Sequence, residues 1–149
     1  MSTDPPRSHL PLLLLLVTAI LLSAFTFDHG LVMFDEGHRL AYAERILAGE
    51  RIYRDFWSVY APAQFYLIAG VLEGFGRDLL VVRLLWVVVR VGTSLALFRA
   101  SLRLLSPPLA FLATLVWLLV PGHLHKAFFV FFPVVGLLIV LRVAEGKSA

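Results

Sequence analysis

An uncharged run of eighteen residues near the start of the chain, from Leu10 to Phe27, restricts what it can fold into. As a helix, this run would rise about 27 Å, close to the roughly 30 Å hydrocarbon core of a bilayer. Of the 149 residues, 60% are hydrophobic and only 15% are charged, whereas a soluble domain typically carries about 25% charged residues. Because one small globule cannot bury so much apolar surface, the sequence predicts an integral membrane protein.

A cleaved signal peptide is the alternative interpretation of the same run. Arg7 would be its basic start and Ser23-Ala24 its cleavage site. The run exceeds the roughly 7–15 apolar residues of a signal core, which favours an uncleaved anchor. Residues 1–9 are polar and contain two prolines, so we expect a disordered tail there.

Four further apolar segments follow a hydrophilic block at residues 28–60, which we expect to lie outside the bilayer. We therefore predict an all-α fold, a polytopic transmembrane helical bundle with a helical first loop, in which residues 61–143 form about four spans after the first. Two segments are short, so four spans in total is the alternative to five, and residues 144–149 form a polar tail. The predicted spans are Leu10–Phe27, Trp57–Phe75, Leu79–Phe98, Leu109–Val120 and Ala127–Val143.

Composition excludes several classes of site. The chain has no cysteine, so disulfides, thiolate metal ligands and a cysteine nucleophile are excluded. The net charge of +3 comes from basic residues spread among apolar segments, which predicts membrane flanks and no nucleic-acid partner. His123 and His125 have no nearby third ligand, so we interpret them as turn residues and predict no metal site and no cofactor.

The hydrophilic block contains one amphipathic segment, which predicts a helix over residues 36–48. Leu40, Ala43 and Leu47 recur at the spacing of one helical face. Asp35 stands in the N-cap position and Gly49 in the C′ position. Because the helix has an apolar face beside a bilayer, we expect it to lie on the membrane surface. Asp35 is therefore either a simple helix cap or a carboxylate that also serves as a general base near the membrane.

The segment at residues 51–57, Arg-Ile-Tyr-Arg-Asp-Phe-Trp, is dense in groups that bind sugars and phosphates. Arginine pairs with anions, and tyrosine and tryptophan stack on sugar faces. The same residue types also gather at lipid headgroups. The segment alone therefore indicates either a binding site or an interfacial anchor.

Taken in order, these elements resemble the front end of the GT-C superfamily of membrane glycosyltransferases. The resemblance is to the bacterial branch akin to protein mannosyltransferases and aminoarabinose transferases, and it covers residues 10–90. Many relatives have two prolines before the second span, where this chain has only Pro62. The matching elements are Asp35-Glu36-Gly37, Ile46-Leu47-Ala48-Gly49, Tyr53-Arg54-Asp55-Phe56, Pro62, Phe65-Tyr66-Leu67, Phe75-Gly76 and Arg83-Leu84.

The resemblance implies transfer of a sugar from a polyprenyl-phosphate-linked donor to an acceptor hydroxyl, with inversion. It implies Asp35 as the catalytic base, with Glu36 as an auxiliary or second candidate. Charge, rather than a matched motif, makes Arg54 or Arg83 the candidate for the donor phosphate. Some family members use a divalent cation, but this branch does not require one. The expected substrate-binding residues are His38, Tyr53, Arg54, Asp55 and Arg83.

The resemblance also places the loop at residues 28–60 on the extracytoplasmic side of a bacterial inner membrane. With the loop on that side, most lysines and arginines would lie outside the cytoplasm. The positive-inside rule therefore favours the opposite orientation. Family enzymes have more spans than this chain offers. We therefore expect an amino-terminal portion that is inactive alone, with membrane lipids, a lipid-linked donor and a partner chain supplying the remaining helices as its partners.

A small non-enzymatic membrane protein, such as a transporter or an assembly subunit, is the alternative. It would use Arg83 and Arg90, which share one face of the third span and could pair between helices, for instance with Glu73. A transporter places its polar groups at bilayer depth. Most of the polar residues lie in the loop at 28–60 instead, which favours the enzyme.

Overall fold

The computed structural model describes residues 10–26, 33–119 and 126–146, and within these ranges the fold is all-helical, as predicted. The chain divides into two compact units, residues 27–88 and residues 1–26 with 89–149, which are described separately. The predicted tail at residues 1–9, the end of the polar tail and the turn with His123 and His125 lie outside the described residues.

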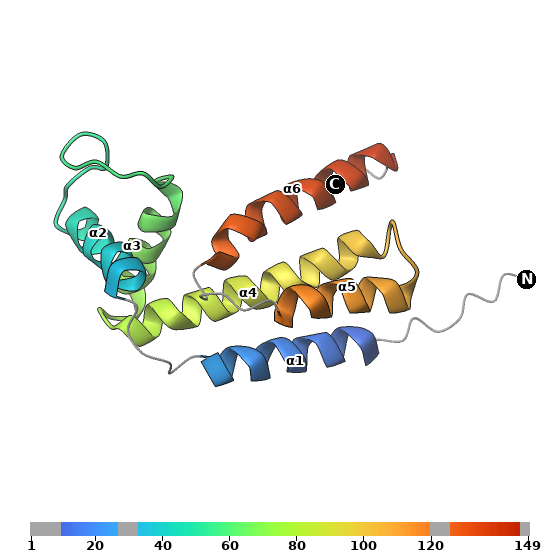
Figure 1. Ribbon diagram of the computed structural model, residues 1–149. Coiled ribbons are helices and arrows are strands. Elements are labelled where there is room, and N and C mark those ends of the chain that lie inside the picture. Colours follow the sequence, from blue (N-terminus) through green and yellow to red (C-terminus); the bar gives the residue numbers. More distant parts are fainter. Residues whose placement is uncertain (1–9, 27–32, 120–125, 147–149) are drawn as a thin grey trace, which may run out of the picture. The chain divides into compact units, whose positions relative to one another are not determined.

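The first unit, residues 27–88, contains the helices α2 (His38–Leu47) and α3 (Ala63–Phe75), joined by an irregular segment that loops out from them (Figure 1). Helices α2 and α3 pack against each other. The irregular segment between them covers residues 48–62. Its residues Ile52 and Phe56 form a small apolar core with Phe65 of α3. The elements are the π turn η1 (Met33–Gly37), α2 (His38–Leu47), α3 (Ala63–Phe75) and the start of α4 (Leu79–Ser101).

The end of α2 confirms the predicted C′ glycine. Gly49 has a φ of +90°, a conformation that glycine adopts without the steric cost of a Cβ atom. The Gly49 N–H donates to the Ile46 carbonyl at 2.9 Å, and the Glu50 N–H donates to the Arg45 carbonyl at 3.0 Å. These two bonds make a Schellman motif, which satisfies carbonyls that the helix leaves open.

The start of α2 differs from the prediction, because Asp35 is not its N-cap. The N-cap is Gly37, without a side-chain capping bond. The chain already winds helically from Met33, through the wider π turn, so Asp35 lies inside the helical path. Such turns have no local sequence signature comparable to a capping box, and they occur often at functional sites.

The helix within the second predicted span is shorter than that span. Helix α3 begins at Ala63, not at Trp57, and Pro62 is its N-cap with a φ of −70°. Proline lacks the N–H that would be unsatisfied at this end and has the φ of a helix start. Residues 57–62 therefore belong to the irregular segment.

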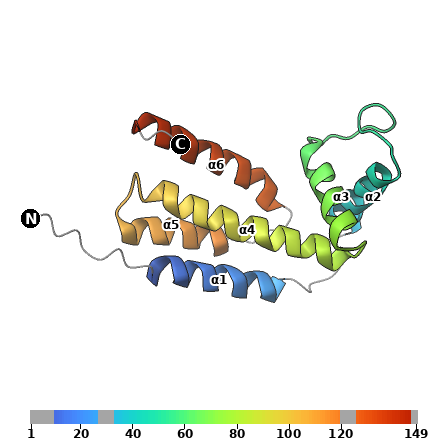
Figure 2. The same ribbon diagram turned by 180° about the vertical axis from the view of Figure 1, so that it is seen from behind.

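The second unit contains α1 (Leu10–Thr26), the rest of α4, α5 (Pro107–Leu119) and α6 (Ala127–Ala144). These bounds agree closely with the predicted spans. Helices α1 and α5 lie side by side, as both views show (Figures 1 and 2). Their shared core contains Leu15 and Ala19 of α1, Ala110 and Leu118 of α5, and Phe98 of α4.

In this second unit, several small residues face inward beside the larger core residues, and many large apolar residues face outward. Ala19, Ser23, Thr93 and Thr114 are all fully buried. The hydroxyls of Thr93 and Thr114 donate to carbonyls one turn earlier in their own helices. The outward side chains, each more than half exposed, include Leu13, Leu21, Phe25, Leu112, Phe132 and Val140.

One helix among the described residues, α4 at Leu79–Ser101, is long and apolar enough to cross a membrane. Its 23 residues would rise about 34 Å. Helices α1, α3, α5 and α6 have the apolar composition expected of spans, but their apolar stretches are shorter, at 10–17 residues. The bundle of five spans therefore stays a prediction.

Candidate functional site

The acidic pair at Asp35 and Glu36 lies in the π turn, and its two carboxylates have different arginine partners. Asp35 pairs with Arg39, one turn along the same helical path. Glu36 pairs with Arg83, which is 47 residues away on α4. The two carboxylates consequently have different environments.

Asp35 combines an accessible carboxylate with a buried cation. The Arg39 side chain is 1% exposed, whereas that of Asp35 is 34% exposed. Nη1 of Arg39 donates to the Asp35 carbonyl oxygen at 2.6 Å and lies 3.4 Å from Oδ1. The Arg39 guanidinium also lies over the ring of Tyr60, 5.1 Å from its centroid. Arg39 therefore holds both the backbone and the side chain of Asp35, while the carboxylate remains reachable from outside.

Glu36 and Arg83 form a buried ion pair between the π turn and α4. Their atoms Oε2 and Nη2 are 2.8 Å apart, and the side chains are 10% and 7% exposed. The sequence had indicated Glu73 as an interhelical partner for Arg83, but Glu73 is exposed. A carboxylate and a guanidinium that are both removed from water stabilise a fold only as a pair. The pair therefore fixes the π turn against the start of α4.

His38 belongs to an aromatic cluster next to the acidic pair. Its ring lies 4.0 Å from that of Tyr42, and it meets Tyr60 edge-on at 6.3 Å. Its Nε2 atom is buried without a hydrogen-bond partner. The Tyr42 hydroxyl donates to the Trp57 carbonyl at 2.9 Å, which ties the irregular segment to α2. His38 thus lies among residues that sequence reasoning had not assigned to the site.

The other predicted binding residues, Tyr53, Arg54 and Asp55, form a tight turn. Arg54 donates two hydrogen bonds to the Asp55 carboxylate, each 3.0 Å long, and the Arg51 N–H donates to the same carboxylate at 2.7 Å. Tyr53 has a φ of +66°, unusual for any residue with a side chain. Its hydroxyl donates to the Tyr60 carbonyl at 2.8 Å. These hydrogen bonds lie within the loop and stabilise its conformation.

The two parts of the predicted site are linked through Tyr60. Its carbonyl accepts from Tyr53, and its ring contacts both His38 and Arg39. Tyr60 and Arg39 are the residues that sequence reasoning missed. Arg39 had a usable signal, since acidic and basic residues four apart on a helix regularly pair. Tyr60 had none, because His38 and Arg39, the site residues that its ring contacts, lie more than 20 residues away.

The turn at Asp55 gives a test based on pH. The hydrogen bonds from Arg54, and then the one from the Arg51 N–H, hold the pKa of Asp55 below its ordinary value of 3.8. The ionised carboxylate therefore stabilises the folded turn above the unfolded pKa, and this contribution is lost as the pH falls through the lower, folded pKa. We expect the amide proton of Arg51, observed by NMR, to titrate with a midpoint below pH 3.8.

Asp55→Asn is the control for this titration, because it keeps the shape of the side chain without a charge. The Arg51 amide of that variant should show no titration in the same range. A wild-type midpoint at or above pH 3.8 would contradict the inferred bonding of Asp55.

Arg90, the charged residue in the middle of α4, has a structural partner. Its Nη2 donates to the Leu118 carbonyl at 2.8 Å, and the residue is 8% exposed. Leu118 lies in the last turn of α5, where the carbonyls have no helical N–H partner. A cation at this end also complements the helix dipole. This bond supports the interhelical interpretation of Arg90 over a phosphate contact.

The described residues contain no group of three or more histidine, cysteine, aspartate or glutamate side chains that could hold a metal ion. Comparison with protein-family models, with curated proteins and with solved structures gave no match. The site is therefore interpreted from its geometry and chemistry.

Proposed function

We propose that the chain takes part in glycosyl transfer, from a sugar linked to polyprenyl phosphate to an acceptor hydroxyl, at the outer face of a membrane. The observation that carries this proposal is the arrangement around Asp35. Its carboxylate is 34% exposed and is held by a buried arginine. A general base must be ionised and must reach the proton that it removes. The Asp35 side chain is accessible and lies beside the cation of Arg39, whereas the Glu36 side chain is buried against Arg83.

In the proposed reaction, a carboxylate oxygen of Asp35 accepts the proton of the acceptor hydroxyl. The acceptor oxygen then forms a bond to the anomeric carbon. The bond from that carbon to the phosphate oxygen breaks, and the electron pair leaves with the polyprenyl phosphate. Because attack and departure are on opposite faces, the configuration of the sugar inverts. Glu36 acts in this scheme as a positioning residue for the turn that carries Asp35.

A membrane location is part of the same proposal, and two observations support it. Helix α4 is long and apolar enough to span a bilayer. In the unit formed by residues 1–26 and 89–149, the buried residues include the small Ala19, Thr93 and Thr114, and many large apolar side chains are more than half exposed. This pattern suits helices that pack closely through small residues while lipid surrounds them. We propose a polytopic protein with the loop at 28–60 on the extracytoplasmic side.

The non-enzymatic alternative receives less support from the described residues. A transporter would need accessible polar groups at bilayer depth. Arg90 is buried and bonded to the end of α5, and Arg83 is buried against Glu36. Both arginines therefore have structural roles, while the accessible carboxylate lies in the hydrophilic loop.

The experiment compares membranes from cells that carry the gene with membranes from cells that lack it. Each sample receives polyprenyl phosphate charged with a radiolabelled hexose or aminopentose, together with the native membrane acceptors. We expect label to reach the acceptor fraction, with release of polyprenyl phosphate, only when the gene is present. Transfer that is the same in both membranes for every donor would reject the proposal. A partner chain, if one is needed, remains present in this assay.

A further inference from the structure

The irregular segment between α2 and α3 carries three large, exposed apolar or aromatic side chains. Tyr53 is 55% exposed, Trp57 is 72% exposed and Val59 is 69% exposed. We call these three residues the aromatic tip. Side chains of this kind are expensive to leave in water, at about 25 cal/mol for each Å² of apolar surface. Within one unit, the same segment buries Ile52 and Phe56, so the exposure of its other apolar residues is selective.

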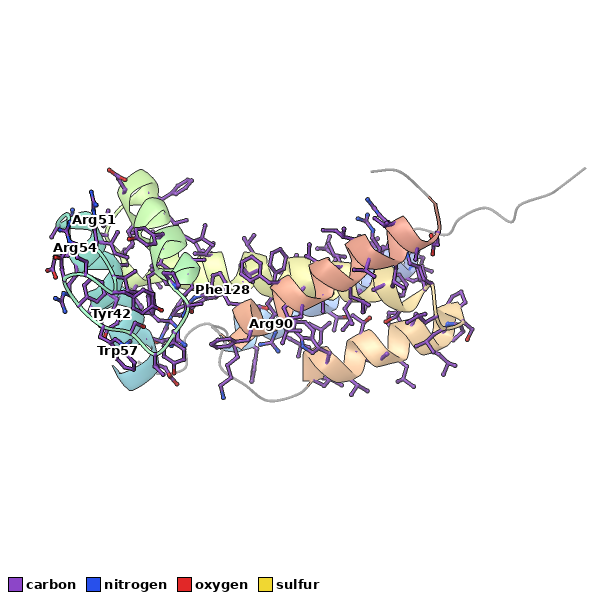
Figure 3. All side chains as sticks on the ribbon, turned by 90° about the horizontal axis from the view of Figure 1, so that it is seen from above. Tyr42, Arg51, Arg54, Trp57, Arg90 and Phe128 are labelled. Atoms are coloured by element: carbon purple, nitrogen blue, oxygen red, sulfur yellow. The ribbon has the colours of Figure 1, made fainter. Side chains whose placement is uncertain are left out.

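The fold holds the aromatic tip in this position. The Tyr53 N–H donates to the Phe56 carbonyl at 2.7 Å, and the Tyr53 hydroxyl donates to Tyr60. The Trp57 carbonyl accepts from the Tyr42 hydroxyl of α2. The positive φ of Tyr53 adds strain that these bonds must offset. The exposed side chains are therefore presented by a bonded loop; Figure 3 shows Tyr42, Arg51, Arg54 and Trp57 on this unit.

We propose that the aromatic tip inserts into the headgroup region of a phospholipid bilayer. Tryptophan and tyrosine prefer this region, because an apolar ring meets the acyl chains while an N–H or O–H group meets water and phosphate. Arg51 is exposed on the same segment, two residues before Tyr53, and supplies a cation for lipid phosphates, whereas Arg54 is already paired with Asp55. Val59 has no group that could recognise a sugar, and this favours lipid over a saccharide ligand.

The rest of the same unit supports a lipid environment. A groove of about 470 Å³ on α3 and the start of α4 is lined only by apolar side chains. Those side chains are Val71, Phe75, Val81, Leu84, Leu85 and Val88. The helices of this unit thus have an apolar exterior, and the adjoining loop carries the aromatic tip. A surface with both features suits contact with the acyl chains and the headgroups of one leaflet. This inference does not rest on the proposed glycosyl transfer.

The test uses the full chain in nanodiscs of phosphatidylcholine and phosphatidylglycerol, with its three tryptophans labelled as 5-fluorotryptophan. The Trp57 signal in the ¹⁹F NMR spectrum is assigned by its loss in Trp57→Phe. Lipids with a spin label near the headgroup should broaden that signal several-fold more than lipids labelled at the end of the acyl chain. Arg51→Gln should weaken the effect in anionic bilayers.

A matched reporter comes from Glu44→Trp in the Trp57→Phe background. Glu44 lies on α2 in the same unit, with a side chain that is 37% exposed, and its reporter should respond little to either lipid label. Three outcomes would overturn the proposal: broadening of the Trp57 signal only by an aqueous paramagnetic reagent, a response only to added sugar phosphate, or protection from both lipid and water by another protein chain.

Discussion

Replacing Asp35 by asparagine should lower the rate of glycosyl transfer by about 10²- to 10⁴-fold, the usual contribution of a general base. Asparagine keeps the size of the side chain and can still accept a hydrogen bond from Arg39, so the π turn should persist. What it loses is the ability to take the proton from the acceptor hydroxyl. The rate is measured in the native membrane assay, and immunoblotting checks that the amount of protein is unchanged.

Glu44→Gln is the matched control for Asp35→Asn. The Glu44 side chain is 37% exposed and pairs with an arginine, Arg77, much as the 34% exposed Asp35 pairs with Arg39. It lies outside the acidic pair, so its neutralisation should leave the transfer rate within about twofold of wild type, because exposed ion pairs contribute little. Equal losses in the two variants, or full activity of Asp35→Asn, would remove Asp35 from the role of base.

Much of the helical layout was predictable because it depends on local patterns. Apolar runs located α1, α4, α5 and α6 to within a few residues of their observed bounds. A glycine at the right distance from an amphipathic stretch predicted the end of α2. These features need only the spacing and the backbone preferences of neighbouring residues.

The candidate site was less predictable because its decisive contacts are not local. The ion pair of Glu36 and Arg83 joins residues 47 positions apart, and nothing in the sequence favoured it over a nearer acid such as Glu73. The resemblance implied Asp35 as the base and Glu36 as an auxiliary or second candidate, but the two residue types alone could not show how far each is exposed. The Asp35 side chain is accessible, whereas that of Glu36 is enclosed. Tyr53, Arg54 and Asp55 were predicted to bind substrate, and the structure shows them bonded within their own turn.

Replacing Arg83 by methionine should destabilise the chain by about 3–5 kcal/mol, because the carboxyl group of Glu36 would stay buried without its ion-pair partner. The free energy of unfolding is measured by titrating the chain in mixed micelles with dodecyl sulfate. Fluorescence of Trp86, which is fully buried on the same part of α4, reports the loss of structure. The glycosyl transfer rate should fall with it, since the π turn that carries Asp35 would lose its attachment to α4.

Two further variants test whether the loss of stability comes from the buried ion pair or from any substitution in this region. Arg77→Met breaks the exposed pair with Glu44, which links α2 to the turn between α3 and α4, and should cost less than about 1 kcal/mol. Adding Glu36→Leu to Arg83→Met removes the unpaired carboxyl group. The double variant should regain most of the stability, because apolar replacements of buried ion pairs are often neutral or stabilising. Comparable losses from Arg77→Met and Arg83→Met, or no recovery in the double variant, would mean that the buried pair does not fix the turn.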